Sequence, residues 1–410
     1  MRTLAATLTA ILLSGCSAVE TKKTGRFGDD VAFMKKHTEV IVLSSADGQA
    51  QVAVAPALQG RVMTSTAAGP GGLSYGWVNF DLFASGQRDP HINVFGGEDR
   101  FWMGPEGGQY SIFFKKGVPF DFAHWFTPAC IDTEPFETVE AKADRARFRR
   151  KIRLENYAGF VFDVEVTREV RLLDAAGAWR ALGTAAPAGV RLVAYETDNQ
   201  LKNAGTAPWT RETGLLSIWI LGMYNPSPET TVVIPYVPGP EAQLGPVVND
   251  RYFGKVPADR LVIGRNVLFF RADGKHRSKI GLTPKRCGNV AGSYDAANGV
   301  LTVVQFNKPE RPAAYVNSMW ELQKDPYDGD AVNSYNDGPV APGAKPLGPF
   351  YELETSSPAA ALKPGETITH IHRTIHLQGD AKALDPVAKG VLGVGLDEIQ
   401  GAFKKQSGSP

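Results

Sequence analysis

The sequence has few cysteines and no excess of charge of either sign, and both shortages narrow the functions open to it. Its 410 residues include 44 Lys or Arg and 43 Asp or Glu, so the net charge of +1 gives no reason to expect a nucleic-acid partner. The cysteines are Cys16, Cys130 and Cys287, which do not form the cluster that a zinc site needs. In an oxidising compartment Cys130 and Cys287 could form a disulfide, or both could remain free thiols, and the sequence leaves both open.

Residues 1–16 have the features of an export signal that ends in a lipid-attachment cysteine. Arg2 precedes an apolar run over residues 4–13, which is too short to span a bilayer. The run ends in Leu-Ser-Gly-Cys, which resembles the bacterial lipobox, so Cys16 is expected to carry lipid and to hold the protein to a membrane. Residues 17–36 would be a tether, and Ser17 fits transport to the outer membrane of a Gram-negative cell envelope. An ordinary cleaved signal is the alternative.

The rest of the chain is dominated by patterns with a period of two, which indicate β-strands. The clearest pattern runs over residues 160–172, where apolar and polar side chains alternate as in a half-buried strand. Further strands are predicted at 38–43, 51–55, 61–66, 191–196, 215–222, 231–236, 267–272, 290–295, 301–306, 315–322, 350–354 and 367–377. Helices are predicted only at 174–182 and 386–405. The sequence therefore predicts an all-β domain of large stacked antiparallel sheets over residues 37–380, followed by a helical tail at 381–410.

One glycine-rich stretch, residues 93–114, concentrates the side chains that a polyhydroxylated ligand needs. Carboxylates, a guanidinium, an indole and an amide lie among five glycines, which let the backbone approach a ligand closely: Glu98, Asp99, Arg100, Trp102, Glu106 and Gln109. Paired carboxylates in different environments can supply the proton donor and acceptor of sugar chemistry. A structural salt bridge that anchors a glycine-rich loop is the alternative.

A second polar cluster occupies residues 320–337. It combines Trp320 and Glu321 with a run of acids and amides that includes Asp330, Asn333, Asn336 and Asp337. Such a set suits sugar hydroxyls or a calcium ion, although its spacing is not that of an EF-hand. The alternative is a turn in which these side chains satisfy their own backbone.

Four of the seven histidines are candidates for a functional role, and they differ in character. His370, His372 and His376 share one face of a predicted strand, and a solvated strand face is favoured over a zinc site, which would need a further ligand. His124 lies beside Trp125, just after the glycine-rich stretch, and could act as an acid or base near neutral pH. A packed, hydrogen-bonded loop histidine is the alternative there.

Several motifs together resemble the galactose-mutarotase-like β-supersandwich superfamily, which includes the aldose 1-epimerases. They are Gly-Arg-Val at 60–62, Asn-Gln-Leu-Lys-Asn-Ala-Gly at 199–205, and Glu-Leu-Glu-Thr-Ser-Ser at 352–357 followed by Leu-Lys-Pro-Gly-Glu at 362–366. Within that superfamily the chain is similar to a set of bacterial envelope proteins that share GGEDRFWxGPEGGQ and GDxxNSYNDG. The resemblance implies the supersandwich fold and a carbohydrate ligand. The central histidine pair and substrate aspartate of the epimerases do not map onto this sequence.

These observations predict a membrane-tethered, carbohydrate-active enzyme whose reaction type stays open among epimerisation, hydrolysis and lyase chemistry. The general acid and base would come from Glu98, Glu106, His124 and Glu321. The substrate would be bound by Asp99, Arg100, Trp102, Gln109, Trp125, Asp330, Asn333, Asn336 and Asp337. No cofactor is expected, although calcium would suit the second cluster. The alternatives are a non-catalytic sugar-binding lipoprotein and a structural envelope protein.

Overall fold

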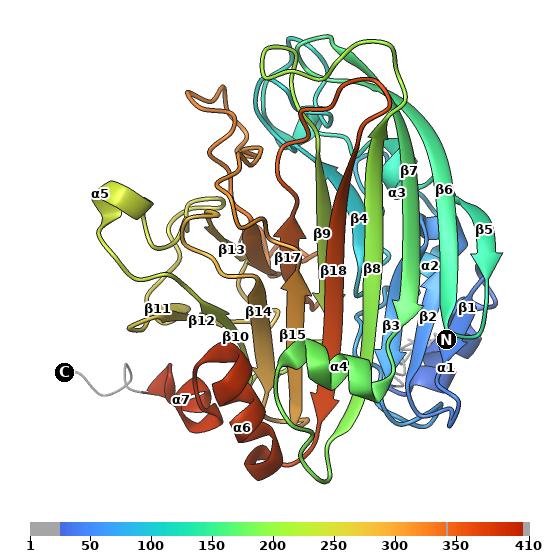
Figure 1. Ribbon diagram of the computed structural model, residues 1–410, viewed down its shortest axis with the longest axis vertical. Coiled ribbons are helices and arrows are strands. Elements are labelled where there is room, and N and C mark those ends of the chain that lie inside the picture. The colour runs from blue at the N-terminus through green and yellow to red at the C-terminus, as the bar shows by residue number, and fades with distance from the viewer. Residues whose placement is uncertain (1–24, 342, 405–410) are drawn as a thin grey trace, which may run out of the picture.

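The computed structural model describes residues 25–341 and 343–404 (Figure 1). The predicted export signal, Cys16 and the first part of the predicted tether lie outside the described residues. None of the helices in the described residues has both the length and the apolar character needed to cross a membrane.

The described strands form three antiparallel sheets, the largest of which has ten strands. Long neighbouring strands at its centre give the molecule its height in Figure 1. In order across the sheet they are β11 (Leu261–Ile263), β12 (Val267–Arg271), β10 (Thr230–Pro235), β14 (Val290–Asp295), β15 (Val300–Phe306), β18 (Thr367–Gln378), β8 (Arg191–Asn203), β7 (Val161–Leu172), β6 (Arg145–Glu155) and β5 (Glu137–Ala141).

A five-stranded sheet and a three-stranded sheet complete the architecture. The five-stranded sheet has the order β13 (Ser278–Leu282), β16 (Val332–Asn336), β17 (Tyr351–Ser356), β9 (Ser217–Tyr224) and β4 (Arg100–Gly104). The three-stranded sheet has the order β1 (Ile41–Ser44), β2 (Gln51–Ala55) and β3 (Arg61–Thr66). The predicted all-β fold of antiparallel sheets is confirmed.

The burial of individual strands follows their position between the layers. In β7 the apolar side chains of Phe162, Val164 and Val166 are buried while alternate positions are more exposed, as the period of two predicts. In β4 and β9 every residue is buried, because both faces of the five-stranded sheet are covered. The largest core cluster joins residues of all three sheets, among them Val54, Phe101 and Phe162.

Helices cover the ends and one face of the sheets. They are α1 (Phe27–Met34), α2 (Phe80–Ser85), α3 (Ala129–Asp132), α4 (Ala175–Leu182), α5 (Glu241–Leu244), α6 (Ala381–Leu392) and α7 (Leu396–Gly401), with short 3-10 turns at Pro56–Leu58 and Phe122–His124. Asp174 and Asp380 cap α4 and α6 by accepting hydrogen bonds from backbone N–H groups three residues later. Both helices pack against the large sheet together with α7 (Figure 1).

Two predictions made for the chain path are wrong. Helix α1 occupies the second half of the tether predicted at residues 17–36, and its side chains Phe27 and Met34 are buried against the three-stranded sheet and α2. The amphipathic spacing of its apolar residues drives this packing. The strand predicted at 315–322 is instead an irregular segment, in which Tyr315 forms an isolated bridge with Asp328.

Candidate functional site

One face of the five-stranded sheet is polar although it is buried. On β17, Glu352 and Glu354 point to this face while Leu353 packs in the core on the other side. The antiparallel register places Glu354 opposite Asn333 on β16, and β16 in turn borders the edge strand β13. The sheet therefore gathers charged side chains from segments that lie far apart in the sequence.

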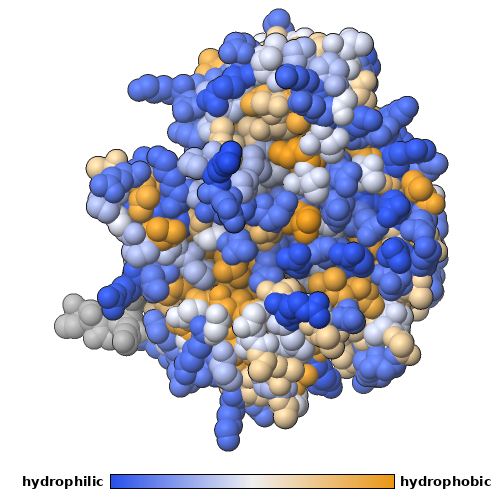
Figure 2. Space-filling view, viewed as in Figure 1, coloured by the Kyte–Doolittle hydropathy of each residue, from blue (hydrophilic) through white to orange (hydrophobic). Residues whose placement is uncertain are grey.

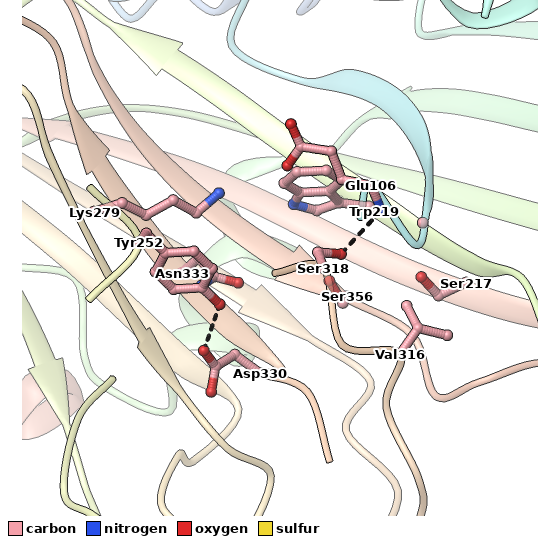
Figure 3. A pocket seen from close by; sticks show the side chains of 11 residues that line it. Glu106, Ser217, Trp219, Tyr252, Lys279, Val316, Ser318, Asp330, Asn333 and Ser356 are labelled. Carbon is pink, nitrogen blue, oxygen red and sulfur yellow. Dashed lines mark hydrogen bonds between the residues drawn. The ribbon is translucent and has the colours of Figure 1, made fainter. Parts of the chain in front are cut away.

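A small pocket opens over this face, and Figure 3 shows its lining. Its lining comes from the sheet, from the segment after β4 and from the loops before β16: Gly104, Glu106, Ser217, Trp219, Tyr252, Lys279, Val316, Ser318, Asp330, Asn333 and Ser356. Its volume is about 20 Å³, which admits one hydroxyl or one water molecule. The half-buried Glu106 is held here because its backbone N–H donates to Ser318 Oγ at 3.2 Å.

Lys279, which lines the pocket, forms an ion pair with Glu354, which is fully buried and is not itself a lining residue. The Lys279 ammonium donates to Glu354 Oε2 at 2.9 Å, and Trp219 Nε1 donates to the same oxygen at 2.9 Å. The ammonium also lies 4.7 Å from the centre of the Trp219 ring and 5.4 Å from that of Tyr252, within cation–π range. Both charges are thereby fixed in place.

A second ion pair lies beside the first on the same face. Arg100 Nη2 is 3.2 Å from Glu352 Oε1, and the guanidinium stacks over the Trp102 ring at 4.2 Å. Burial raises the pKa of Glu352 although Arg100 opposes this shift, and the neighbouring Glu354 carboxylate raises it further. Strand β17 thus carries two buried carboxyl groups, each paired with a different cation.

The ionisable groups that line the pocket also have displaced pKa values. Burial raises the pKa of Asp330 to about 6, even though Tyr252 Oη donates to Asp330 Oδ2 at 2.6 Å. Burial likewise raises the pKa of Glu106, against the opposing effect of Lys279. For Lys279 burial lowers the pKa, but the surrounding carboxylates, Glu354 first, outweigh it and the net shift is upward. The pocket therefore holds a fixed cation next to carboxyl groups that titrate closer to neutral pH than free ones.

Five buried polar atoms at this face have no hydrogen-bond partner within the described part of the chain. They are Arg100 Nε and Nη1, Trp102 Nε1, Ser217 Oγ and Glu354 Oε1. Buried polar groups are otherwise almost always paired, so a concentration of orphaned donors with an acceptor calls for an explanation. Of the four residues, Ser217 lines the pocket itself, and the other three lie on the sheet face beside it.

The structure brings some of the predicted site residues together and separates others. Glu106, Asp330 and Asn333 line the pocket, and Arg100 and Trp102 lie on the sheet face next to it. Gln109 is near the rim, where its side-chain amide exchanges hydrogen bonds with the backbone of Gln323. It fixes two loops to each other.

Glu98 and Asp99, predicted to act on the substrate, are instead fully buried away from this pocket. Glu98 accepts hydrogen bonds from Ser65, Tyr195 and His376. Asp99 is paired with Arg168 at 2.6 Å in a site with no exposure of either side chain. The salt-bridge alternative therefore applies to Asp99.

Two amide and acid residues of the second cluster are also structural. Asn336 accepts from the backbone N–H of Gly274, and Asp337 accepts from Tyr335 Oη and from the backbone N–H of Gly348. These contacts are not the local turn of the alternative interpretation, because Asn336 ends strand β16 and its partner Gly274 is 62 positions away.

The remaining predicted residues lie outside the pocket. His124 is partly exposed and bound to Asp121 on a surface turn, and Glu321 is exposed. Trp125 is buried, with its ring stacked between Phe113 and Trp320. Its role in this structure is to pack the core beneath the loop.

The three histidines of β18 are buried, so the predicted solvated strand face is wrong. Thr355 Oγ1 lies 2.8 Å from both His370 Nε2 and His372 Nδ1. Burial lowers the pKa of His370 to about 3 and that of His372 to about 4, so both rings are neutral near pH 7. They face inward because β18 lies in the middle of the large sheet.

Sequence reasoning did not single out several residues of the pocket. Tyr252, Trp219, Ser318 and Lys279 come from segments without a recognisable motif. The alternation Glu352-Leu353-Glu354 was noted as a family motif and not as a site. Two acids at a period of two in a buried strand are unusual, and that pattern could have pointed to the site.

Metal and disulfide chemistry have no evident position in the described residues. Over residues 25–341 and 343–404, no three or more His, Cys, Asp or Glu side chains are grouped so that they could hold a metal ion. Cys130 and Cys287 are free thiols, and Cys287 is fully buried.

Comparisons with known proteins give a family match and similarities of fold. Residues 25–403 match the model of a family of unknown function, DUF6786. No curated protein matches the sequence. The solved Slr1438 protein from Synechocystis sp. PCC 6803 is similar with a TM-score of 0.49 and 13% identity, covering 84% of this chain and 96% of that one.

Two further solved structures are similar to this chain. A galactose mutarotase-like protein from Lactobacillus casei ATCC 334 has a TM-score of 0.45 and 10% identity, covering 83% of this chain and 100% of that one. A galactose mutarotase related enzyme from Lactobacillus acidophilus has a TM-score of 0.44 and 10% identity, covering 83% and 97%. At these identities the similarity concerns the fold and assigns no role to any residue.

Proposed function

Because the chain belongs to the DUF6786 family, whose function is unknown, we propose its activity from the pocket itself: it is a carbohydrate-active enzyme that works at Glu106, Lys279 and Glu354. The observation that supports this most is the set of orphaned polar atoms on one sheet face, at Arg100, Trp102, Ser217 and Glu354. Sugar hydroxyl groups donate and accept hydrogen bonds at once, so they complement a surface with both unpaired donors and an unpaired acceptor.

The proposed chemistry is general acid–base catalysis by carboxyl groups in different environments. Glu106, with its raised pKa, is the candidate proton donor, since it is half-buried and lines the pocket. Glu354 is held by Lys279 and Trp219 through Oε2, while its Oε1 stays without a protein donor and is the candidate acceptor. Ring opening and glycosidic cleavage both need such a pair.

The size of the pocket limits what part of a sugar could enter it. A volume of about 20 Å³ suits one hydroxyl group of a terminal sugar rather than a chain of sugars. The proposed substrate is therefore a free sugar or the end of an oligosaccharide, with the reacting oxygen next to Glu106.

The test is a screen of the purified protein and Glu106→Gln against free sugars and oligosaccharides, with products and anomeric ratios followed by NMR. Exposed Glu398→Gln on α7 is the matched control. Turnover by the parent and the control, with a loss of about 100-fold or more in Glu106→Gln, is expected for a general acid. Equal turnover by both variants would show that the chemistry lies elsewhere.

Non-catalytic sugar binding is a second candidate, and one observation favours it. Lys279 and Arg100 each engage a carboxylate of the face in an ion pair, and carboxylates locked to cations favour recognition over proton transfer. In the same NMR experiments, changes of chemical shift on addition of a sugar, without turnover by any variant, would identify non-catalytic sugar binding.

We also propose that Cys16 carries a lipid anchor in the cell envelope. The support is the Leu-Ser-Gly-Cys sequence after the short apolar run, which precedes the first described residue by nine positions. Labelling of cells with a radioactive fatty acid should mark the parent protein and not Cys16→Ser, and fractionation should move the variant away from the membrane. Equal labelling of both proteins would contradict the anchor.

A further inference from the structure

A second and much larger cavity lies apart from the small polar pocket. It has a volume of about 690 Å³, within the range of cavities that hold small organic ligands. Its lining comes from α1, from residues 73–84, and from the ends of β9, β14, β15 and β17. Among the described residues the two sites share no lining residue, so the cavity is a separate feature of the fold.

The lining of the cavity carries charge of one sign. Four aspartates contribute to it, Asp29, Asp30, Asp81 and Asp295, whereas no Lys, Arg or His is present among its described lining residues. Asp29 and Asp81 are exposed at the entrance, while Asp295 is buried. Carboxylates around a concave, partly apolar surface create a negative potential inside it, which attracts cations.

The floor of the cavity ends in a buried relay of three side chains. Thr302 Oγ1, which lines the cavity, lies 2.9 Å from His376 Nδ1, and His376 Nε2 lies 3.0 Å from Glu98 Oε2. Glu98 also accepts a hydrogen bond from the backbone N–H of Ser65, so its carboxylate acts as an acceptor. With Glu98 as the acceptor, His376 donates through Nε2, and in the neutral ring Nδ1 accepts the proton of Thr302 Oγ1. The oxygen of Thr302 is then an acceptor, and it is shared with the hydroxyl group of Tyr351, which also lines the cavity.

Other hydrogen-bond donors among the lining residues are also used on acceptors within the protein. Both N–H groups of the Asn225 amide are used, on the backbone oxygens of Ser74 and Gly76, which leaves the Asn225 carbonyl oxygen. The Tyr75 hydroxyl donates to Gln378 Oε1 and the Tyr224 hydroxyl to the backbone oxygen of Glu98. The cavity therefore offers acceptors and few donors, which is the complement of a ligand rich in N–H groups.

The walls of the cavity are aromatic and apolar. Phe33, Leu73, Trp77 and Phe80 line it, and the ring of Tyr75 on its floor stacks on His376 with 4.5 Å between ring centres. Aromatic rings attract cations through their faces and pack against hydrocarbon. The same walls would cover the apolar body of a ligand.

We propose that this cavity is a binding site for an organic amine: a protonated ammonium group joined to an apolar or aromatic body. The ammonium is received by Thr302 and Asn225 on the floor, Asp29 and Asp81 at the entrance attract it electrostatically, and the apolar body lies against Phe33, Trp77 and Phe80. This site is independent of the proposed sugar chemistry, because the groups that form it are different.

Calorimetric titration of the purified full chain with phenethylamine, beside its neutral analogue phenethyl alcohol, tests the proposal. The amine is expected to bind about tenfold or more tightly than the alcohol, since hydrogen bonds to a charged group are the stronger ones. Its affinity should fall as salt is added, because mobile ions screen the aspartates. Equal affinity of the two probes would overturn the proposal.

Variants locate the binding. Thr302→Val keeps the shape of the floor and is expected to lower the affinity for the amine by about tenfold. The double variant Asp29→Asn/Asp81→Asn changes the exposed entrance and is expected to lower the affinity by about two- to tenfold. Asp397→Asn, exposed on α7 and outside the lining, should bind as the parent does. If Thr302→Val does not fold, as judged by thermal unfolding, the entrance double variant still decides. Unchanged binding in both, or no binding of phenethylamine and octylamine at millimolar concentration, would refute the site.

Discussion

Lys279 on the edge strand β13 reaches across β16 to place its ammonium 2.9 Å from Glu354 on β17. The side chains are 10% and 0% exposed, so this ion pair is shielded from water on nearly all sides. Both charges must have been removed from solvent when the sheet formed, and each is tolerated because the other is present. The pair therefore couples the candidate site to the stability of the fold.

Replacement of Lys279 by Met should be strongly destabilising. The variant leaves the Glu354 carboxylate buried without its cation, which costs about 3–5 kcal/mol in the free energy of unfolding. Urea denaturation measures this loss. Replacement of Lys389, which forms an exposed pair with Asp385 on α6, is the control and should change the midpoint little. A midpoint for Lys279→Met equal to that of the control would contradict the importance of the buried pair.

The stability of the protein should depend on pH through Asp330. Its pKa is raised by burial from 3.8 to about 6, so between these values the folded state keeps a proton that the unfolded state releases. The free energy of unfolding from this group therefore falls as pH rises through that window, by about 3 kcal/mol in total. Asp330→Asn removes the titration.

The measurement for Asp330 is the difference in unfolding free energy between the parent and Asp330→Asn from about pH 4 to about pH 7. The stability of Asp330→Asn relative to the parent should increase as the pH rises. If the relative stability of the variant stays constant or decreases as the pH rises, the carboxyl group of Asp330 is not held in its protonated form.

Thr355 should be important because one hydroxyl group serves two buried imidazoles. Thr355→Val removes the hydrogen bonds to His370 and His372 and leaves ring nitrogens unpaired in the interior, at a cost of about 1–3 kcal/mol. Thermal and urea unfolding measure the loss. Thr367→Val, at the exposed start of β18, is the matched control. Equal stability of the two variants would argue against the bridging role.

Gly76 should not tolerate even a methyl group. A Cβ atom there would lie 2.3 Å from the Met63 carbonyl oxygen and 2.7 Å from Glu98 Cγ, so the backbone or the buried acid must move. Gly76→Ala is expected to cost about 1–3 kcal/mol of unfolding free energy. Gly71→Ala, where nothing lies within 4 Å, is the control, and an equal effect of both would show that the close approach is not strained.

The sequence predicts seven of the ten strands of the large sheet, and the ones it misses are β5, β6 and β11. In β7 the alternation was clear, and in the structure the same residues are buried and exposed in turn. Complete burial alone does not hide a strand, because β9 is buried throughout and the strand predicted at 215–222 overlaps it. The strand β4 is missed because its five residues show no alternation and lie within the glycine-rich stretch. A strand covered on both sides looks like any other apolar or mixed segment between glycines.

The site was harder to predict because it depends on distant partners. Glu98 and Glu106 are similar in sequence context, yet one meets His376, 278 positions away, and the other meets Ser318, 212 positions away. Residue type and local spacing identified both as candidates. Only the pairing of strands decided which carboxylate opens to a pocket and which becomes part of the interior.

On the face shown in Figure 2, hydrophilic side chains predominate and hydrophobic ones lie in small separate groups. This face thus offers no broad apolar surface for contact with a partner.

The order of strands in the large sheet has a consequence for how the chain reaches its native state. The last strand, β18, lies between β15 and β8 in the middle of the sheet, although it is the final strand along the sequence. During synthesis or export, β15 and β8 each remain an unpaired edge strand until residues 367–378 are available to pair with both. Such late, long-range closure makes folding slow and exposes intermediates to aggregation. A chain cut before Thr367 would lose the central strand of its largest sheet.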